Sequence, residues 1–220
     1  LSDGQRLTAR RVLDSRPPQQ DISWPVFREL RADWAGRIDL QGVCLIGVDG
    51  CSEEAGFPQV ADVVAQSGGV LGMVTYPVPD LRDRLRLFFR LAEARGLVAD
   101  FHVDETMDPA VETLRDIAEL KIETGFSGRV VVGHCCSLSA QDEARALDTL
   151  DLVAKAGIDV VSLPMCNLYL QDRTQAGVAR TPRRRGITLV HEMRERGIRV
   201  SFASDNTRDP FYASRDMDML

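Results

Sequence analysis

GLVADFHVDET, residues 96–106, contains both features that recur along this chain, an apolar run and polar residues at its end. It begins as an apolar run typical of a buried strand, and it ends in a histidine and two carboxylates. Burying a charged group costs free energy unless the charge is paired or bound. The position of His102, Asp104 and Glu105 at the end of a buried strand therefore indicates that something compensates for their burial.

Other apolar runs along the chain resemble the one at residues 97–103. They are VCLIGV (43–48), VLGMVTY (70–76), RVVVGH (129–134), IDVVSLP (158–164) and IRVSFAS (198–204), with a weaker candidate at TARRVL (8–13). Successive runs are mostly about 30 residues apart, with one interval of about 40, which is the size of a strand, a loop and a helix. Near-continuous apolar strands in this rhythm predict a parallel sheet covered by helices.

The segments between the runs have the periodicity of amphipathic helices. In DPAVETLRDIAELKI (108–122), Asp108 is the predicted N-cap and Pro109 the first helical residue. The apolar face of this helix is predicted to consist of Val111, Leu114, Ile117 and Ile122. The helices within residues 84–96 and 187–197 are each predicted to end at a glycine.

Two closures of such a sheet are known, an open doubly wound sheet and a (β/α)₈ barrel. No GxGxxG or GxxxxGK[ST] motif follows a strand, which disfavours the nucleotide-binding open sheet. Polar residues instead follow several different strands, as they do in barrels. We therefore predict an α/β fold, a (β/α)₈ TIM-like barrel. Only six strands are clear, so residues 1–220 are expected to form one partial barrel domain.

Composition argues against two classes of partner. The net charge is −6 and the one notable basic run is RRR at 183–185, which does not suit a nucleic-acid binder. No apolar stretch approaches the ~20 residues that cross a bilayer, so no membrane partner is expected. The five cysteines are odd in number and mostly lie in apolar runs, as reduced thiols of a cytoplasmic protein do.

Three strands end in groups that can bind a metal or move protons: His102 with Glu105, His134, and Asp205 with Asn206. Each group alone also fits a structural hydrogen bond or a helix cap. Together they suit one divalent cation, Zn²⁺ or Fe²⁺, which accepts imidazole and carboxylate ligands and lowers the pKa of bound water. Glu105 would then move protons.

Two other features allow a simple interpretation. His191 lies within a charged helical segment and is predicted to be a surface residue. The aromatic segment DPFYA (209–213) suits one wall of a pocket for a flat ring, and ordinary packing explains it equally well.

The sequence resembles a known family. FHVDET, VVGHC, SLPMCNLYLQDR, PRRRGITLVHEMRERGIRVSFASDN and RDPFYASRDMDML, in this order, are similar to the cytosine deaminase branch of the amidohydrolase superfamily. The resemblance covers most of residues 22–220 and is strongest from residue 97 onward. It implies a distorted barrel with a metal at its C-terminal mouth.

The resemblance implies a role for each matching residue. His102 corresponds to a metal-binding histidine, and Asp205 to a metal ligand that is also a general base. Glu105 corresponds to the proton-shuttling glutamate, and His134 to the histidine that orients water. Asn206 and Phe211 are expected to contact the substrate. The implied reaction is attack of metal-activated water on the amino-bearing carbon of a cytosine-like or other nitrogen heterocycle, with release of ammonia.

The sequence departs from the family at its first metal-binding element. The family has an HxH pair on the first strand, whereas this sequence has three histidines and no HxH. The chain is therefore expected to be an excerpt that lacks this strand, or a degenerate protein. Hydrolysis of an N-alkylamino-triazine and a non-catalytic barrel remnant stay open as alternatives, as does a homo-oligomer.

Overall fold

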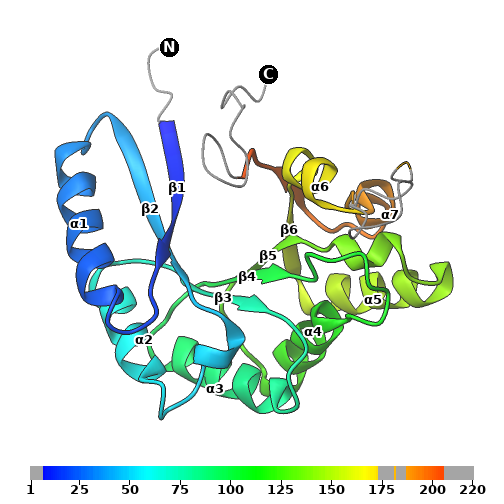
Figure 1. Cartoon of the computed structure of the whole chain (residues 1–220), viewed down its shortest axis with the longest axis horizontal. Coiled ribbons are helices and arrows are strands. Elements are labelled where there is room, and N and C mark those ends of the chain that lie inside the picture. Colours follow the sequence, from blue (N-terminus) through cyan, green and yellow to red (C-terminus); the bar gives the residue numbers. More distant parts are fainter. Residues whose placement is uncertain (1–6, 173–180, 182–186, 206–220) are drawn as a thin grey trace. The chain divides into compact units, whose positions relative to one another are not determined.

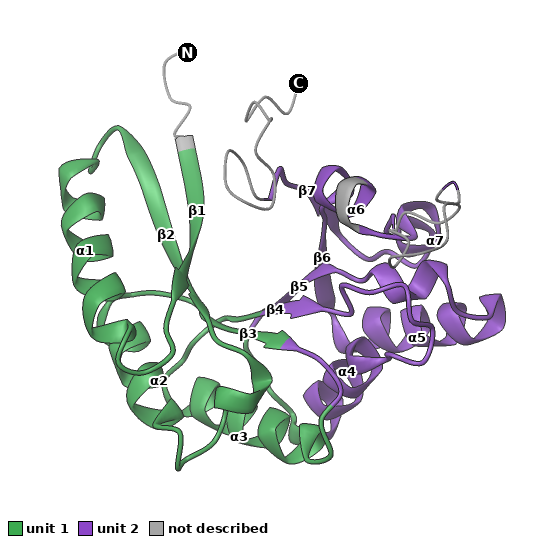
Figure 2. Ribbon diagram, in the orientation of Figure 1, with its two compact units in different colours: residues 1–74, 78–100, 124–128 green, residues 75–77, 101–123, 129–220 purple. Residues whose placement is uncertain are grey.

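Strands and helices alternate along the chain in a computed structural model, which describes residues 7–172, 181 and 187–205 (Figure 1). The chain forms two compact units. One comprises residues 1–74, 78–100 and 124–128, and the other comprises residues 75–77, 101–123 and 129–220 (Figure 2).

The first unit is built on parallel strands with aromatic residues in its core. Its elements are β1 (Leu7–Asp14), α1 (Gln20–Asp33), β2 (Ile38–Leu45), η1 (Val48–Gly50), α2 (Phe57–Gln66), most of β3 (Leu71–Thr75) and α3 (Leu81–Ala94). β1 and β2 pair in parallel from Leu7↔Ile38 to Asp14↔Leu45. A Cβ on Gly72 would lie 2.2 Å from the Cys44 carbonyl oxygen, so only glycine allows the close approach of the backbone there.

The second unit contains the strands that end in the candidate site residues. Its elements are most of β4 (Ala99–Val103), α4 (Thr113–Thr124), β5 (Val130–His134), η2 (Cys136–Ser139), α5 (Glu143–Ala156), β6 (Ile158–Ser162), α6 (Pro164–Leu170), α7 (Val190–Glu195) and β7 (Val200–Phe202). The five-stranded sheet has the order β3-β4-β5-β6-β7. β6 pairs in parallel with both β5 and β7. Parallel strands bring their carboxyl ends to one edge of the sheet.

Most of the predicted elements are confirmed, including the weaker strand candidate at residues 8–13, which is β1. Of the run predicted at residues 43–48, only residues 43–45 belong to β2, which begins at Ile38 and ends at Leu45, and Val48 begins η1. The predicted helix stops are also confirmed, because Gly96 and Gly197 both have positive φ angles just after α3 and α7. The described residues thus form parallel sheets alternating with helices, as the apolar runs indicate.

The predicted start of α4 is wrong. The helix begins at Thr113, so neither Asp108 nor Pro109 belongs to it. Its buried face is also shifted from the prediction: Leu114 and Ile117 are fully buried, but Ile122 is 39% exposed. The buried positions of α4 are Thr113, Leu114, Ile117, Ala118 and Leu120. His191 on α7 is exposed, as predicted, and the basic run at 183–185 lies outside the described residues.

Candidate active site

At the carboxyl ends of three strands of the second unit lie side chains that can bind a metal ion or transfer protons. His102 is the penultimate residue of β4, and His134 is the last residue of β5. Asp205 follows three residues after the end of β7. Glu105 lies in the turn that leaves β4.

The structure brings these four side chains together. The ring centroids of His102 and His134 are 5.4 Å apart. His134 lies between the two carboxylates, with its Nδ1 3.5 Å from Oε1 of Glu105 and its Nε2 3.9 Å from Oδ2 of Asp205. Residues separated by up to about 100 positions in sequence thus lie around His134.

Helix α6 adds side chains that the sequence did not indicate as site residues. Cys166 is buried, and its Sγ lies 3.9 Å from Oε1 of Glu105. One donor atom each from Glu105, Cys166 and Asp205 lies within 4.8 Å of the other two. Asn167 is fully buried, and its Oδ1 lies 3.1 Å from Nδ1 of His134. Both residues lie in SLPMCNLYLQDR, where the sequence offers no local signal that separates a site cysteine from the other reduced thiols in apolar runs.

The electrostatics of the cluster favour a bound cation. Burial, and then the negative charge of Asp205, raises the pKa of Glu105 to about 7. Burial also raises the pKa of the Cys166 thiol, with Asp205 acting in the same direction. A cation among these groups would offset the repulsion between the two carboxylates. Nitrogen, oxygen and sulfur donors together suit Zn²⁺ or Fe²⁺, so the residues present fit such an ion.

The backbone is unusual at the same strand ends. Among the described residues, five that are not glycine have positive φ angles, and four of these border the cluster: Asp104, His134, Cys135 and Asp205. Non-glycine residues in this conformation cost free energy and gather at functional sites. The backbone therefore marks the same edge of the sheet that the side chains mark.

A comparison with known proteins identifies the family. A sequence profile described as the amidohydrolase family matches residues 61–220, which is most of the chain. The chain belongs to the amidohydrolase family. A curated pterin deaminase from Rhizobium rhizogenes is 51% identical over 209 residues, which are 95% of this chain and 47% of that protein.

Solved structures support the assignment to the amidohydrolases. A 5-methylcytosine deaminase from Klebsiella pneumoniae, bound to 5-fluorocytosine, matches with a TM-score of 0.78 and 25% identity, over 94% of this chain and 50% of that one. An N-isopropylammelide isopropylaminohydrolase from Burkholderia multivorans shares the fold, with a TM-score of 0.68, 18% identity, and coverage of 97% and 50%. The chain thus spans about half the length of the relatives it matches.

The sequence also led to expectations about substrate contacts and about membranes. Asn206 and Phe211, the predicted substrate contacts, lie outside the described residues. None of the described helices combines the length and the apolar character needed to cross a membrane.

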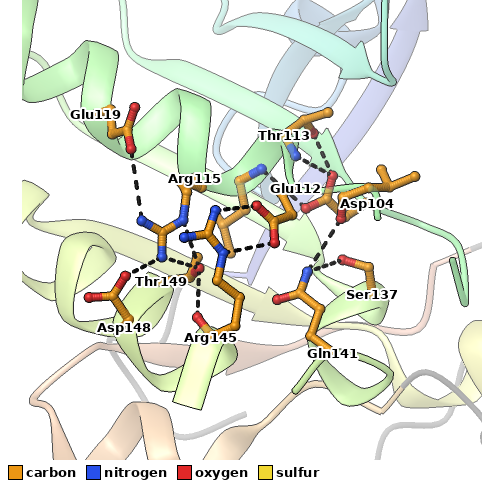
Figure 3. Close-up of polar contacts among 12 residues, drawn as sticks. Asp104, Glu112, Thr113, Arg115, Glu119, Ser137, Gln141, Arg145, Asp148 and Thr149 are labelled. Atoms are coloured by element: carbon orange, nitrogen blue, oxygen red, sulfur yellow. Dashed lines mark hydrogen bonds and ion pairs between the residues drawn. The ribbon is translucent and has the colours of Figure 1, made fainter. Parts of the chain in front are cut away.

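Asp104 has a structural role beside the cluster. Its carboxylate accepts hydrogen bonds from the Thr113 amide (2.9 Å), the Thr113 hydroxyl (2.6 Å) and the Leu114 amide (3.1 Å), so it caps α4 (Figure 3). Burial raises its pKa to about 6, and these hydrogen bonds act in the opposite direction. Its carbonyl oxygen accepts from the Cys136 and Ser137 amides. Asp104 therefore ties the turn after β4 to α4 and to the turn after β5.

We expect Asp104→Ala to lower the free energy of unfolding by about 2–4 kcal/mol, because it removes a cap and leaves buried amides without their acceptor. Asp108→Ala is the matched control, since Asp108 is exposed and its carboxylate accepts a local hydrogen bond from the Ala110 amide, two residues away. Its effect should stay within about 0.5 kcal/mol. Urea unfolding measures both variants, and equal effects would contradict the assignment.

Proposed function

We propose that this amidohydrolase chain carries part of the active site of a hydrolytic deaminase that acts on an amino-substituted nitrogen heterocycle. The convergence of His102, Glu105, His134 and Asp205 supports the chemistry. The 51% identity to a pterin deaminase supports a pterin, a fused two-ring heterocycle, over the single ring of cytosine. The finer fold we propose is a (β/α)₈ TIM-like barrel, of which residues 1–220 form one partial domain.

The proposed cofactor is one divalent cation, Zn²⁺ or Fe²⁺. His102 and Asp205 would hold it, and Cys166 offers a third donor atom within reach of Asp205. When bound, such an ion lowers the pKa of a coordinated water and so supplies a nucleophile at neutral pH. The buried free cysteines of this chain agree with a reducing, cytoplasmic setting.

The chain's own residues then have separate tasks. Asp205 accepts a proton from the attacking water, and His134 orients that water from the opposite side of the cluster. Glu105 protonates the ring nitrogen beside the amino-bearing carbon, a task that suits a carboxyl group whose pKa is raised to about 7. Asp205 then gives its proton to the amino group, which leaves as ammonia. The remaining hydroxyl proton passes to Glu105 as the water oxygen becomes the ring carbonyl oxygen, so both carboxyl groups return to their starting states. Asn206 and Phe211 are proposed to contact the ring.

Ammonia release from a panel of heterocycles tests this proposal. We expect the purified protein to deaminate pterin with a kcat/KM at least about tenfold above that for cytosine, a difference of roughly 1.4 kcal/mol in transition-state stabilisation. An N-alkylamino-triazine should release little amine. Chelation should abolish turnover, and added Zn²⁺ or Fe²⁺ should restore it.

The other outcomes separate the alternatives. Faster turnover of cytosine than of pterin would indicate a single-ring substrate. Faster release of amine from the triazine than of ammonia from pterin would favour the N-alkylamino reaction. A protein that carries stoichiometric metal and deaminates no member of the panel would contradict the proposed function and favour a non-catalytic remnant.

A further inference from the structure

The buried hydrogen bond between His134 and Asn167 determines where the His134 ring carries its proton. Both side chains are almost completely buried, with exposed fractions of 1% for His134 and 0% for Asn167. Nδ1 of His134 lies 3.1 Å from Oδ1 of Asn167. The same nitrogen lies 3.5 Å from Oε1 of Glu105. Nδ1 therefore faces two oxygen atoms.

A neutral imidazole has one N–H donor and one lone-pair acceptor. An amide oxygen and an ionised carboxylate oxygen can only accept hydrogen bonds. A proton on Nδ1 satisfies both oxygens, whereas a lone pair on Nδ1 would oppose both. We infer that Asn167 is a positioning residue that holds His134 as the Nδ1–H tautomer and leaves the lone pair on Nε2.

The consequence appears on the other side of the ring. Nε2 is 3.9 Å from Oδ2 of Asp205, so a lone pair of the imidazole and a carboxylate oxygen face the same space. Two acceptors in this arrangement can share a hydrogen-bond donor such as a water molecule, or they can both bind one cation. The opposite tautomer would point an N–H at that space and would remove one of the two acceptors.

The structure holds both partners of this hydrogen bond in place. The His134 carbonyl oxygen accepts a hydrogen bond of 2.8 Å from the buried Thr188 hydroxyl. Asn167 belongs to α6, and Gln171, at the end of that helix, donates from Nε2 to the Glu105 carbonyl oxygen at 3.3 Å. Residues four apart share one side of a helix. Asn167 and Gln171 thus connect α6 to the turns that follow β5 and β4.

Nitrogen-15 NMR of histidine in the zinc-loaded protein reads the tautomer directly, without turnover. Zn²⁺ suits the measurement because it has no redox chemistry. Spectra recorded at rising pH, until the ring shifts no longer change, identify the neutral ring, in which one of the two nitrogens carries a proton. The His134 signals are assigned as those lost in His134→Gln. We expect a protonated Nδ1 and an unprotonated Nε2.

Two substitutions of similar size separate the role of the acceptor from that of packing. Asn167→Asp keeps an oxygen at this position and should keep the proton on Nδ1. Asn167→Leu removes the acceptor and should move a measurable share of the proton to Nε2. Its kcat for deamination should fall about 10- to 100-fold, the usual effect of losing a residue that orients a site histidine.

Two results would overturn the inference: a proton on Nε2 in the unmodified protein, or an unchanged tautomer in Asn167→Leu. If Asn167→Leu does not fold, the unmodified protein and Asn167→Asp still test the inference. A neutral His134 ring with its proton on Nε2 in either protein would contradict the inference. Only the kcat expectation rests on the proposed function. A protein with the Nδ1–H tautomer and no deaminase activity would therefore refute the proposed function while this inference stands.

Discussion

Replacing Glu105 with glutamine should lower kcat for deamination by about 10²- to 10⁴-fold, the usual contribution of a general acid–base group. Glutamine keeps the size of the side chain but cannot pick up or release the proton that the ring nitrogen needs. Glu105 is suited to this transfer because its side chain is still 33% exposed while burial and Asp205 raise its pKa to about 7. Steady-state kinetics measures the loss.

The metal content of the Glu105→Gln variant is the second part of this test. Since His102 and Asp205 are the proposed ligands, the variant should keep its metal. Glu119→Gln is the matched control, because Glu119 lies on α4 and its carboxylate pairs with Arg115 at 3.8 Å (Figure 3). It should leave turnover unchanged. Loss of the metal together with turnover would show that Glu105 is a ligand, and unchanged turnover in Glu105→Gln would refute the proton transfer.

Replacing His102 with alanine should reduce both metal occupancy and kcat/KM by at least about 100-fold. Loss of an outer residue that supports a metal ligand already costs about 10–100-fold, and His102 is proposed to be a ligand itself. The ring of His102 faces that of His134 with centroids 5.4 Å apart, so its removal also opens space in the cluster. Elemental analysis after dialysis against a metal buffer gives the occupancy.

His191→Ala is the control for this substitution. His191 is exposed on α7, and it is the one remaining histidine of the chain besides His102 and His134. Its replacement should change neither the metal content nor kcat/KM. A His102→Ala protein that keeps a full complement of metal would contradict the ligand assignment, whatever its activity.

The parts of the fold that the sequence predicted are those in which local pattern and tertiary position agree. LVADFHV and RVVVGH are apolar enough to fit only buried strands, and both are strands in the sheet. Polar residues that follow such runs lie at the strand ends. The sequence alone therefore predicts that His102, His134 and Asp205 lie close together. The structure brings them together at the carboxyl ends of the strands.

The cap of α4 shows where local pattern is insufficient. Asp108 followed by Pro109 is a good local signal for a helix start, yet the helix begins at Thr113. The carboxylate that caps it belongs to Asp104, nine residues before Thr113, and it reaches the helix because of the left-handed turn after β4. A cap at that distance depends on the folded path of the chain, which local capping rules do not describe.

The contribution of α6 was missed for a similar reason. Cys166 contacts Glu105 across 61 positions in sequence, and Asn167 contacts His134 across 33. A cysteine in a short apolar segment is common in protein cores, so Cys166 gave no local signal of a site. Only the return of the chain after β6 gives these two side chains a place beside the cluster.

Anomalous X-ray scattering at the absorption edge of the metal, in crystals of the purified protein, locates the bound cation and so shows which residues hold it. We expect one peak at the carboxyl ends of β4 and β7, about 2.0–2.2 Å from an imidazole nitrogen of His102 and a carboxylate oxygen of Asp205. In crystals of protein with stoichiometric metal, a peak away from both residues would contradict the account.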